Sequence, residues 1–123
     1  MENSKEFTVS LKSFCKINLF LKVISKRKDG FHNIFSYLMP ISLYDEIYFE
    51  KIEEDRFEIE TIGADIKKEE NLVYRAGLVL KEYSKNKKGV KIKIIKNVPL
   101  GSGLGGGSSN CALTLNFLNK YWE

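Results

Sequence analysis

A glycine-rich stretch between a strand-like run and a helix-like run constrains this chain more than any other feature. Residues 99–112 read PLGSGLGGGSSNCA and hold five of its nine glycines. Residues 90–96 before it are strand-like, and apolar residues recur at helical spacing after it. Glycines allow positive φ angles and close backbone approach, and the first turn of a helix offers unpaired N–H groups to an anion. The pattern predicts a phosphate-binding loop.

Two related motifs and a flexible linker are the alternatives for this stretch. A P-loop needs a lysine after the glycines, where this chain has Ser108 and Ser109. Gly101, Gly103 and Gly106 match the dinucleotide fingerprint GxGxxG, but a second strand with an acidic residue about 20 positions later does not follow. An apolar residue inside the stretch and the helical pattern directly behind it argue against a linker.

The remaining hydrophobic pattern predicts an α+β domain. Strand-like alternation occurs over 9–14, 17–23, 34–39, 43–51 and 57–62. A helix is expected from an Asn71 cap to about residue 84, and Gly77 within it allows close packing. The residues expected on one face of that helix are Leu72, Val73, Ala76, Leu80 and Tyr83.

The last helix is expected from about Ser108. Its apolar residues Leu115, Leu118 and Trp122 need partners, and we expect them to be left without full burial in a chain of this length. Such a chain would tend to associate.

Composition is that of an ordinary globular protein. The chain has 123 residues, 43% hydrophobic and 29% charged, which suits one domain or part of one. No apolar run approaches the roughly 20 residues that span a bilayer, and the first seven residues lack a signal-peptide core. Cys15 and Cys111 form no metal-ligand spacing. We therefore expect reduced thiols, a cytoplasmic location and no membrane partner.

The net charge of +4 is unevenly distributed, since seven of the twenty Lys and Arg residues lie within 81–96. A nucleic-acid surface is one interpretation of such a cluster. Aromatic residues that would stack on bases are not interleaved with these lysines, so a solvated helix end and outer strand face is favoured. We expect no nucleic-acid partner.

The glycine stretch also resembles the nucleotide-binding motif of the GHMP kinases, as P-x-x-x-G-L-G-G-G-S-S-N over 99–110. Four other segments are similar to motifs of one branch of that superfamily and come in the same order. They are KINL at 16–19, KRKDGFH at 26–32, LYDE at 43–46 and NLV at 71–73. That branch phosphorylates the 2-hydroxyl of a cytidine diphosphate-linked methylerythritol in the non-mevalonate isoprenoid pathway.

The resemblance implies a ribosomal-protein S5 domain 2-like fold and an ATP-dependent small-molecule kinase that uses Mg²⁺. It implies that residues 1–123 are the N-terminal, ATP-binding domain and that the C-terminal domain is absent. The catalytic aspartate of the family follows the glycine loop in a G-A-D-[VI]-P-type segment. Residues 63–66 (GADI) match it superficially, but Asp65 precedes the loop and is followed by lysines, so Asp65 is rejected. This chain alone is therefore expected to be inactive.

Lys16 is the catalytic residue that the resemblance implies. A cation near the reacting oxygen stabilises charge that develops during phosphoryl transfer. A lysine on a strand is otherwise usually a solvated outward residue.

Three residues would contact the substrate: Asn18, Phe31 and His32. The ring of Phe31 can stack on a cytosine, and His32, the only histidine, offers a donor and an acceptor to the base edge. The family more often has tyrosine at position 31. Without the resemblance, His32 would be a turn residue.

The ATP-binding residues that the resemblance implies border the adenine or wrap the phosphates. Asn71 is equally explained as a helix cap, and sequence does not choose between Ser108 and Ser109 as the hydroxyl for phosphate or Mg²⁺. The set is Asn71, Leu72, Lys96, Pro99, Leu100, Gly101, Ser102, Gly103, Leu104, Gly105, Gly106, Gly107, Ser108 and Ser109. Another small-molecule kinase of the superfamily and a non-enzymatic nucleotide- or RNA-binding module are the alternative functions.

Overall fold

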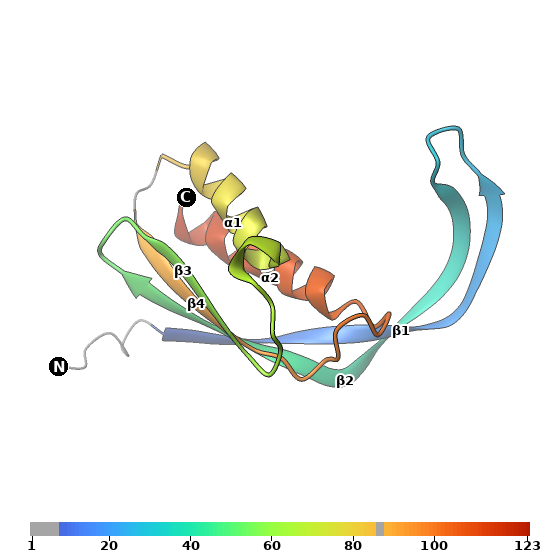
Figure 1. Ribbon diagram of the computed structural model, residues 1–123, viewed down its shortest axis with the longest axis horizontal. Helices are drawn as coiled ribbons and strands as arrows, with labels where there is room; N and C mark the ends of the chain where they lie inside the picture. The colour runs from blue at the N-terminus through green and yellow to red at the C-terminus, as the bar shows by residue number, and fades with distance from the viewer. Residues whose placement is uncertain (1–7, 86–87) are drawn as a thin grey trace.

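A four-stranded mixed sheet is covered on one face by two helices (Figure 1). The computed structural model describes residues 8–85 and 88–123, so the first seven residues and Lys87 of the basic segment lie outside the described residues. The elements are β1 (Thr8–Lys26), β2 (His32–Ile52), β3 (Phe57–Ile62), the short helix η2 (Lys68–Glu70), α1 (Leu72–Tyr83), β4 (Gly89–Ile95) and α2 (Gly106–Tyr121). The strand order is β1-β2-β4-β3, with β4 antiparallel to β2 and parallel to β3.

Strict alternation of side chains places one face of the central strands in the core. In β4, Val90, Ile92 and Ile94 are buried, and Ile47 and Phe49 of β2 lie beside them on the same face. Successive residues of a strand point to opposite faces, so Lys91 and Lys93 face outward. The α+β fold expected from the sequence is confirmed, and the pattern of β4 alone predicts its buried face.

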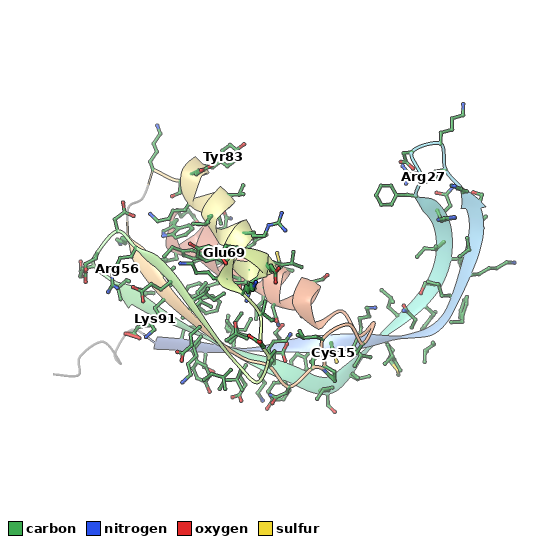
Figure 2. The ribbon with its side chains drawn as sticks, viewed as in Figure 1. Cys15, Arg27, Arg56, Glu69, Tyr83 and Lys91 are labelled. Atoms are coloured by element: carbon green, nitrogen blue, oxygen red, sulfur yellow. The ribbon has the colours of Figure 1, made fainter. Side chains whose placement is uncertain are left out.

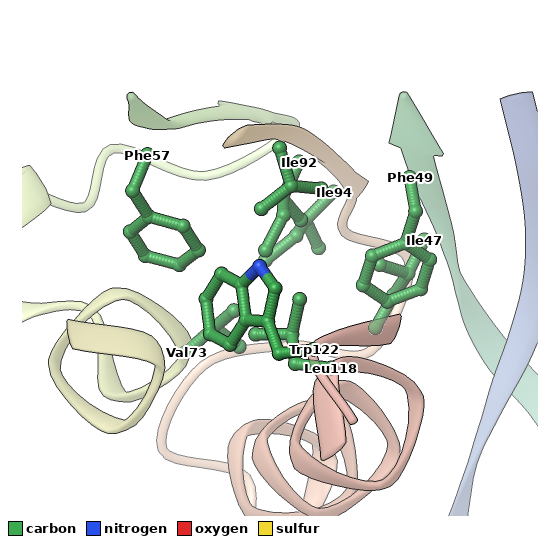
Figure 3. Close-up of a cluster of buried hydrophobic side chains, with 9 residues drawn as sticks. Ile47, Phe49, Phe57, Val73, Ile92, Ile94, Leu118 and Trp122 are labelled. Atoms are coloured by element: carbon green, nitrogen blue, oxygen red, sulfur yellow. The ribbon is translucent and has the colours of Figure 1, made fainter. Parts of the chain in front are cut away.

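The core lies between this sheet face and the two helices (Figure 3). The Trp122 indole packs among Phe57, Val73 and Leu118, and its Nε1 donates to the carbonyl of Lys88 at 2.9 Å. Phe117 of α2 stacks on Phe49 with ring centroids 4.0 Å apart. The indole thereby satisfies its one donor while its ring is buried in the core.

Helix α1 begins where the sequence predicts, but it buries a narrower face. The Asn71 side chain accepts a hydrogen bond from the Val73 amide at 2.9 Å, which is an N-cap. Val73 and Gly77 are its buried residues. The prediction that Leu72 and Tyr83 share this face is wrong, because Leu72 is 48% exposed and Tyr83 83% exposed. Figure 2 labels Tyr83 at the end of α1. Only the turn positions nearest the sheet are covered.

Helix α2 corrects two expectations. It begins at Gly106, two residues before Ser108, because Gly105 in a left-handed conformation serves as its N-cap. Of the three residues expected to lack full burial, Leu118 is 0% and Trp122 5% exposed, whereas Leu115 is half-buried. The sheet and helix α1, which packs beside α2, supply the partners that the sequence pattern alone did not reveal.

The strands β1 and β2 are longer than the sequence predicts and extend beyond the sheet as a hairpin. The gaps expected at 15–16 and 40–42 are instead register shifts, including one between Phe14 and Lys16, opposite Pro40. A β-bulge bends a ladder and tolerates a proline that cannot donate. The far half of the hairpin curves to the helix side of the sheet (Figure 1) and exposes many apolar side chains.

The outer face of the sheet carries charges in complementary stripes. Lys91 of β4 lies opposite Glu50 of β2 and Glu58 of β3. Two other lysines of the basic segment 81–96 also have acidic partners. Lys81 pairs with Asp55, and the ammonium group of Lys96 is buried against Asp45. Opposite charges on neighbouring strands stabilise the sheet and reduce the positive potential that a polyanion would need.

Candidate active site

The glycine-rich loop connects β4 to the N-terminus of α2. Gly101, Gly103 and Gly105 have φ angles of +66°, +78° and +73°, which favour glycine. The amide of Ser109 donates to the carbonyl of Gly105 as the first helical hydrogen bond, so the preceding N–H groups of the turn have no helical acceptor. The loop therefore has the backbone that anion binding requires.

Lys16 lies on the edge strand β1, which β2 separates from β4, and its side chain reaches this loop. Its Nζ donates to the carbonyl of Gly103 at 2.9 Å, and its backbone amide donates to the carbonyl of Leu104 at 2.9 Å. A Cβ on Gly105 would lie 2.8 Å from the Lys16 Cε. Lys16 is thus half-buried against the loop, unlike an ordinary lysine of a strand.

A cavity of about 570 Å³ lies where Lys16 meets the loop. Its lining includes Cys15, Lys16, Gly105, Ser108 and Ser109, and Figure 2 labels Cys15 on β1. None of the described residues that line it is Asp or Glu. It offers a cation and hydroxyl groups, which suit an anion, but it offers no carboxylate base.

A second cavity, of about 350 Å³, lies at the same helix N-terminus. It brings together Asn71, Leu72, Lys96, Leu100 and Gly107, five of the residues expected to bind ATP, with other side chains that include Asp65, Glu70 and Asn110. Its size is within the range of small-ligand pockets. Asp65 lines this cavity and not the one at Lys16.

Lys96 is buried and bound to other side chains, unlike a lysine whose ammonium is available to bind a phosphate. Its side chain is 4% exposed, and its ammonium lies 2.6 Å from Asp45 Oδ2 and 3.0 Å from Asn110 Oδ1. The same Asp45 carboxylate accepts from the backbone amides of Asn97 and Val98. Burial would raise the pKa of Asp45, but these hydrogen bonds, led by that of Lys96, hold the pKa below its ordinary value.

Sequence reasoning did not assign the buried Asp45, Asn110 and Ser13 to the site. One signal was available for Asp45, because it holds the inward position that Ile47 and Phe49 continue along β2. A carboxylate in a row of core positions needs buried partners. Those partners come from other elements, so their identity depends on the tertiary structure.

The three expected substrate residues lie along the protruding hairpin. Asn18 is two residues from Lys16 and accepts from the Ser36 hydroxyl at 3.1 Å. His32 lies opposite Lys26 in the pairing of β1 with β2. Lys26 is about 26 Å beyond Asn18 along β1, at ~3.3 Å per residue. Phe31 is 71% exposed near the tip. The described structure places Asn18 near Lys16, but it does not bring Phe31 and His32 beside the loop.

Two glycines of the loop differ in what a side chain would meet. At Gly106 a Cβ would lie 2.9 Å from Val98 Cγ1, so this glycine allows α2 to pack on the core. At Gly105 it would meet Lys16. Gly101 and Gly103 have open space, and their requirement is conformational.

The described residues do not form a metal site by themselves. Across 8–85 and 88–123, no group of three or more His, Cys, Asp or Glu could hold a metal ion. Mg²⁺ in phosphoryl transfer uses carboxylates together with substrate phosphates, and in the cavity at Lys16 the serine hydroxyls are the side-chain oxygens among the lining residues. Within the same residues, no helix is long and apolar enough to cross a membrane.

Comparison with known proteins shows that this chain is similar to part of several small-molecule kinases. The family model described as "GHMP kinases N terminal domain" matches residues 71–123, which include α1, the loop and α2. The resemblance expected from the motifs is therefore confirmed, and the chain has the fold of a GHMP kinase N-terminal domain.

The more specific resemblance is to 4-diphosphocytidyl-2-C-methyl-D-erythritol kinases. The relative from Acinetobacter baumannii is 44% identical over 115 residues, which cover 94% of this chain and 41% of the relative. The relative from Thermodesulfovibrio yellowstonii is 46% identical over 115 residues, covering 94% and 39%. A crystal structure of 4-(cytidine 5'-diphospho)-2C-methyl-D-erythritol kinase matches with a TM-score of 0.78 at 32% identity, covering 93% of this chain and 41% of that one. The chain thus spans about two fifths of the length of these relatives.

Proposed function

We propose that this chain is the N-terminal, ATP-binding domain of an enzyme that phosphorylates the 2-hydroxyl of 4-diphosphocytidyl-2-C-methyl-D-erythritol. The relatives over 94% of the chain are kinases named for this substrate. The resemblance extends to the hairpin as well as to the glycine loop, so it includes the segments proposed to contact substrate. The domain assignment covers residues 1–123.

The contact between Lys16 and the glycine loop carries this proposal. Lys16 and Gly103 are 87 residues apart in the sequence, yet Lys16 Nζ lies 2.9 Å from the Gly103 carbonyl. The ammonium is therefore held beside the N–H groups that would bind phosphate. ATP supplies the γ-phosphoryl group, and Lys16 would stabilise negative charge that develops on the transferring oxygens.

The remaining residues have roles that follow from their positions. The residues around the 350 Å³ cavity, with Asn71 and Leu72, would border the adenine, and the backbone of 99–109 would surround the phosphates. Asn18, Phe31 and His32 would contact the substrate from the hairpin. The hairpin curves toward the helix side, which would bring its tip closer to a long substrate (Figure 1).

Location and partners belong to the same proposal. Both cysteines are free, Cys15 buried and Cys111 half-buried, which favours a reducing cytoplasm. The complementary charges on the outer sheet face favour a small-molecule ligand over nucleic acid. The coordination of Mg²⁺ would have to be completed by ATP phosphates and by groups outside the described residues.

A direct comparison of ligands tests the proposal. The full-length protein, meaning the enzyme that carries residues 1–123 as its N-terminal domain, is titrated by calorimetry. The ligands are 4-diphosphocytidyl-2-C-methyl-D-erythritol, mevalonate and a short RNA, each with and without ATP. We expect saturable binding of the cytidine ligand and of ATP, with no binding of the other two. Preference for mevalonate would indicate another small-molecule kinase, and preference for RNA would reject the enzyme.

A further inference from the structure

The buried carboxylate of Asp45 organises the residues behind the glycine loop. It is 0% exposed and accepts four hydrogen bonds. Oδ1 accepts from the amides of Asn97 and Val98 at 2.6 and 2.8 Å, at the entry to the loop. Oδ2 accepts from Lys96 Nζ at 2.6 Å and from Asn110 Nδ2 at 3.0 Å. One side chain of β2 thus holds both the loop entry and the first turns of α2.

The charges of this pair fix the orientation of the Asn110 amide. An ammonium only donates, so the Asn110 atom 3.0 Å from Lys96 Nζ must be the oxygen. The amide nitrogen then faces Asp45 and also donates to Ser13 Oγ at 2.8 Å. If the amide were flipped, its nitrogen, a donor, would face the Lys96 ammonium. Its oxygen, an acceptor, would face the Asp45 carboxylate.

The direction of hydrogen bonding continues from Asn110 to the cavity at Lys16. Because Ser13 Oγ accepts from Asn110, its own proton is free to donate, and it donates to Ser109 Oγ at 2.9 Å. Ser109 accepts this bond, so its proton must point away from Ser13. Ser109 lines the 570 Å³ cavity together with Lys16 and Gly105.

We infer that Ser109, and not Ser108, is the serine whose hydroxyl donates to a phosphate oxygen, and that Asp45, Asn110 and Ser13 are positioning residues that direct its proton. This inference rests on the proposed function, because it assumes that the loop binds the phosphates of a nucleotide. Ser13 on β1 and Asp45 on β2 are directly opposite in the register, so the sheet itself holds the network together.

The arrangement prepares the site before a ligand binds. The loop is fixed at its entry by Asp45 and near its middle by Lys16, and the Ser109 hydroxyl is fixed by Ser13. Groups that are already oriented lose less freedom on binding and need no rearrangement when they meet charge. The buried ion pair therefore has a directional role in addition to a structural one.

A double-mutant cycle on Ser13 and Ser109 tests this inference through ATP affinity of the full-length protein. Ser109→Ala should weaken ATP binding about tenfold or more, since a hydrogen bond to a charged group is lost. Ser13→Ala should weaken it by a smaller factor, about threefold to tenfold, because the Ser109 hydroxyl remains but is free to rotate. In the Ser109→Ala background, Ser13→Ala should have no further effect.

Controls separate positioning from folding. Ser10→Ala makes the same change at an exposed position of β1 and should leave ATP affinity unchanged. Ser13→Thr keeps the hydroxyl and should restore most of the affinity. Binding of adenosine, which lacks phosphates, should be equal in all variants. Circular dichroism verifies folding, and Asn110 keeps Asp45 as an acceptor in Ser13→Ala.

The outcomes distinguish this inference from the proposed function. If the wild-type protein does not bind ATP, both are overturned. Two outcomes in a protein that binds ATP would reject only this inference. In one, Ser13→Ala and Ser109→Ala lower the ATP affinity independently of each other. In the other, Ser109→Ala binds ATP as tightly as the wild type. Should Ser13→Ala not fold, Ser109→Ala compared with Ser109→Thr decides the question, because the threonine keeps the hydroxyl.

Discussion

At the scale of single residues, Lys16 illustrates how tertiary contact changes the meaning of a side chain. On a strand, a lysine is usually solvated, and in the sequence only its place in the KINL motif singles Lys16 out. Here the aliphatic part of the side chain lies against Gly105, and the ammonium reaches the Gly103 carbonyl. A charge that is held in place contributes more to a transition state than a mobile one.

We therefore predict that Lys16→Ala lowers kcat by about 100-fold or more, with a change of only a few-fold in ATP affinity, because its charge matters most during transfer. Steady-state kinetics of the full-length protein and ATP titration measure the two quantities. Lys12→Ala on the same strand, at an exposed position, is the matched control. Turnover within a few-fold of wild type would show that Lys16 is only a structural cation.

Asp45 makes the stability of the fold depend on pH. Burial would raise the pKa of Asp45, but the hydrogen bonds from Lys96, Val98, Asn97 and Asn110 keep the pKa below its ordinary value. A carboxyl with a lower pKa in the folded state stabilises the fold above its unfolded-state pKa of about 4. That contribution is lost as pH falls through the folded-state pKa. The fold should therefore lose stability as the pH falls below about 4.

We predict that Asp45→Asn lowers the free energy of unfolding at neutral pH by about 3–5 kcal/mol, because Lys96 keeps its buried charge without a carboxylate. The loss of stability below about pH 4 should also become shallower. Urea unfolding across this range measures both effects. Glu46→Gln removes a carboxylate from the outer face of β2 as a control, and an Asp45 variant with the wild-type pH dependence would contradict the assignment.

At the scale of elements, Gly77 sets the distance between α1 and β3. A Cβ at this position would overlap the Phe57 ring at Cζ and lie 2.8 Å from its Cε2. Glycine inside a helix costs about 1 kcal/mol relative to alanine. The chain accepts that cost because Phe57 is part of the core and stacks on Tyr74.

Gly77→Ala is predicted to destabilise the protein by about 1–2 kcal/mol, since overpacking costs more than the gain in helix propensity. Urea unfolding gives the change in free energy. The double variant Gly77→Ala with Phe57→Leu tests the cause, because a smaller side chain should make alanine at position 77 favourable. A stabilised single variant would mean that α1 can move away from the sheet at no cost.

The glycine loop offers a second prediction at this scale. Gly105→Ala and Gly30→Ala both place a Cβ at a positive φ, which costs about 1–2 kcal/mol of stability. Only at Gly105 would the Cβ meet a side chain, that of Lys16, because Gly30 has open space. ATP affinity should therefore fall severalfold in Gly105→Ala and stay constant in Gly30→Ala. Equal ATP affinities of Gly105→Ala and Gly30→Ala would show that the loop at Gly105 does not take part in nucleotide binding.

The elements were predictable where local pattern decides them. Alternation in β4 and the Asn71 cap gave correct positions because each depends on neighbouring residues. The start of α2 was missed by two residues, because a left-handed Gly105 acts as a cap without a side chain. The continuous β1 and β2 were missed because register shifts at the bulges interrupt the alternation that a strand normally shows.

At the scale of the whole molecule, the site depends on contacts between distant segments. The glycine loop was predictable from its composition, and the 350 Å³ cavity contains five of the residues expected to bind ATP. The network of Asp45, Asn110 and Ser13 joins two strands to α2 over sequence separations of up to 97 residues. Hydrophobic periodicity carries no information about such polar pairs, so only the folded structure reveals them.

The arrangement of carboxylates leads to the last prediction, that the 123-residue chain by itself catalyses negligible phosphoryl transfer. No Asp or Glu is among the described residues that line the cavity at Lys16. Asp45 is buried and bound to Lys96, and Asp65 lines the other cavity, so neither is positioned to accept a proton beside Lys16. We expect weak ATP binding and no turnover when the purified chain is assayed with ATP, Mg²⁺ and 4-diphosphocytidyl-2-C-methyl-D-erythritol. Turnover typical of a kinase, about 1–100 per second, would require a base among these residues, and Asp65→Asn would then be the first variant to examine.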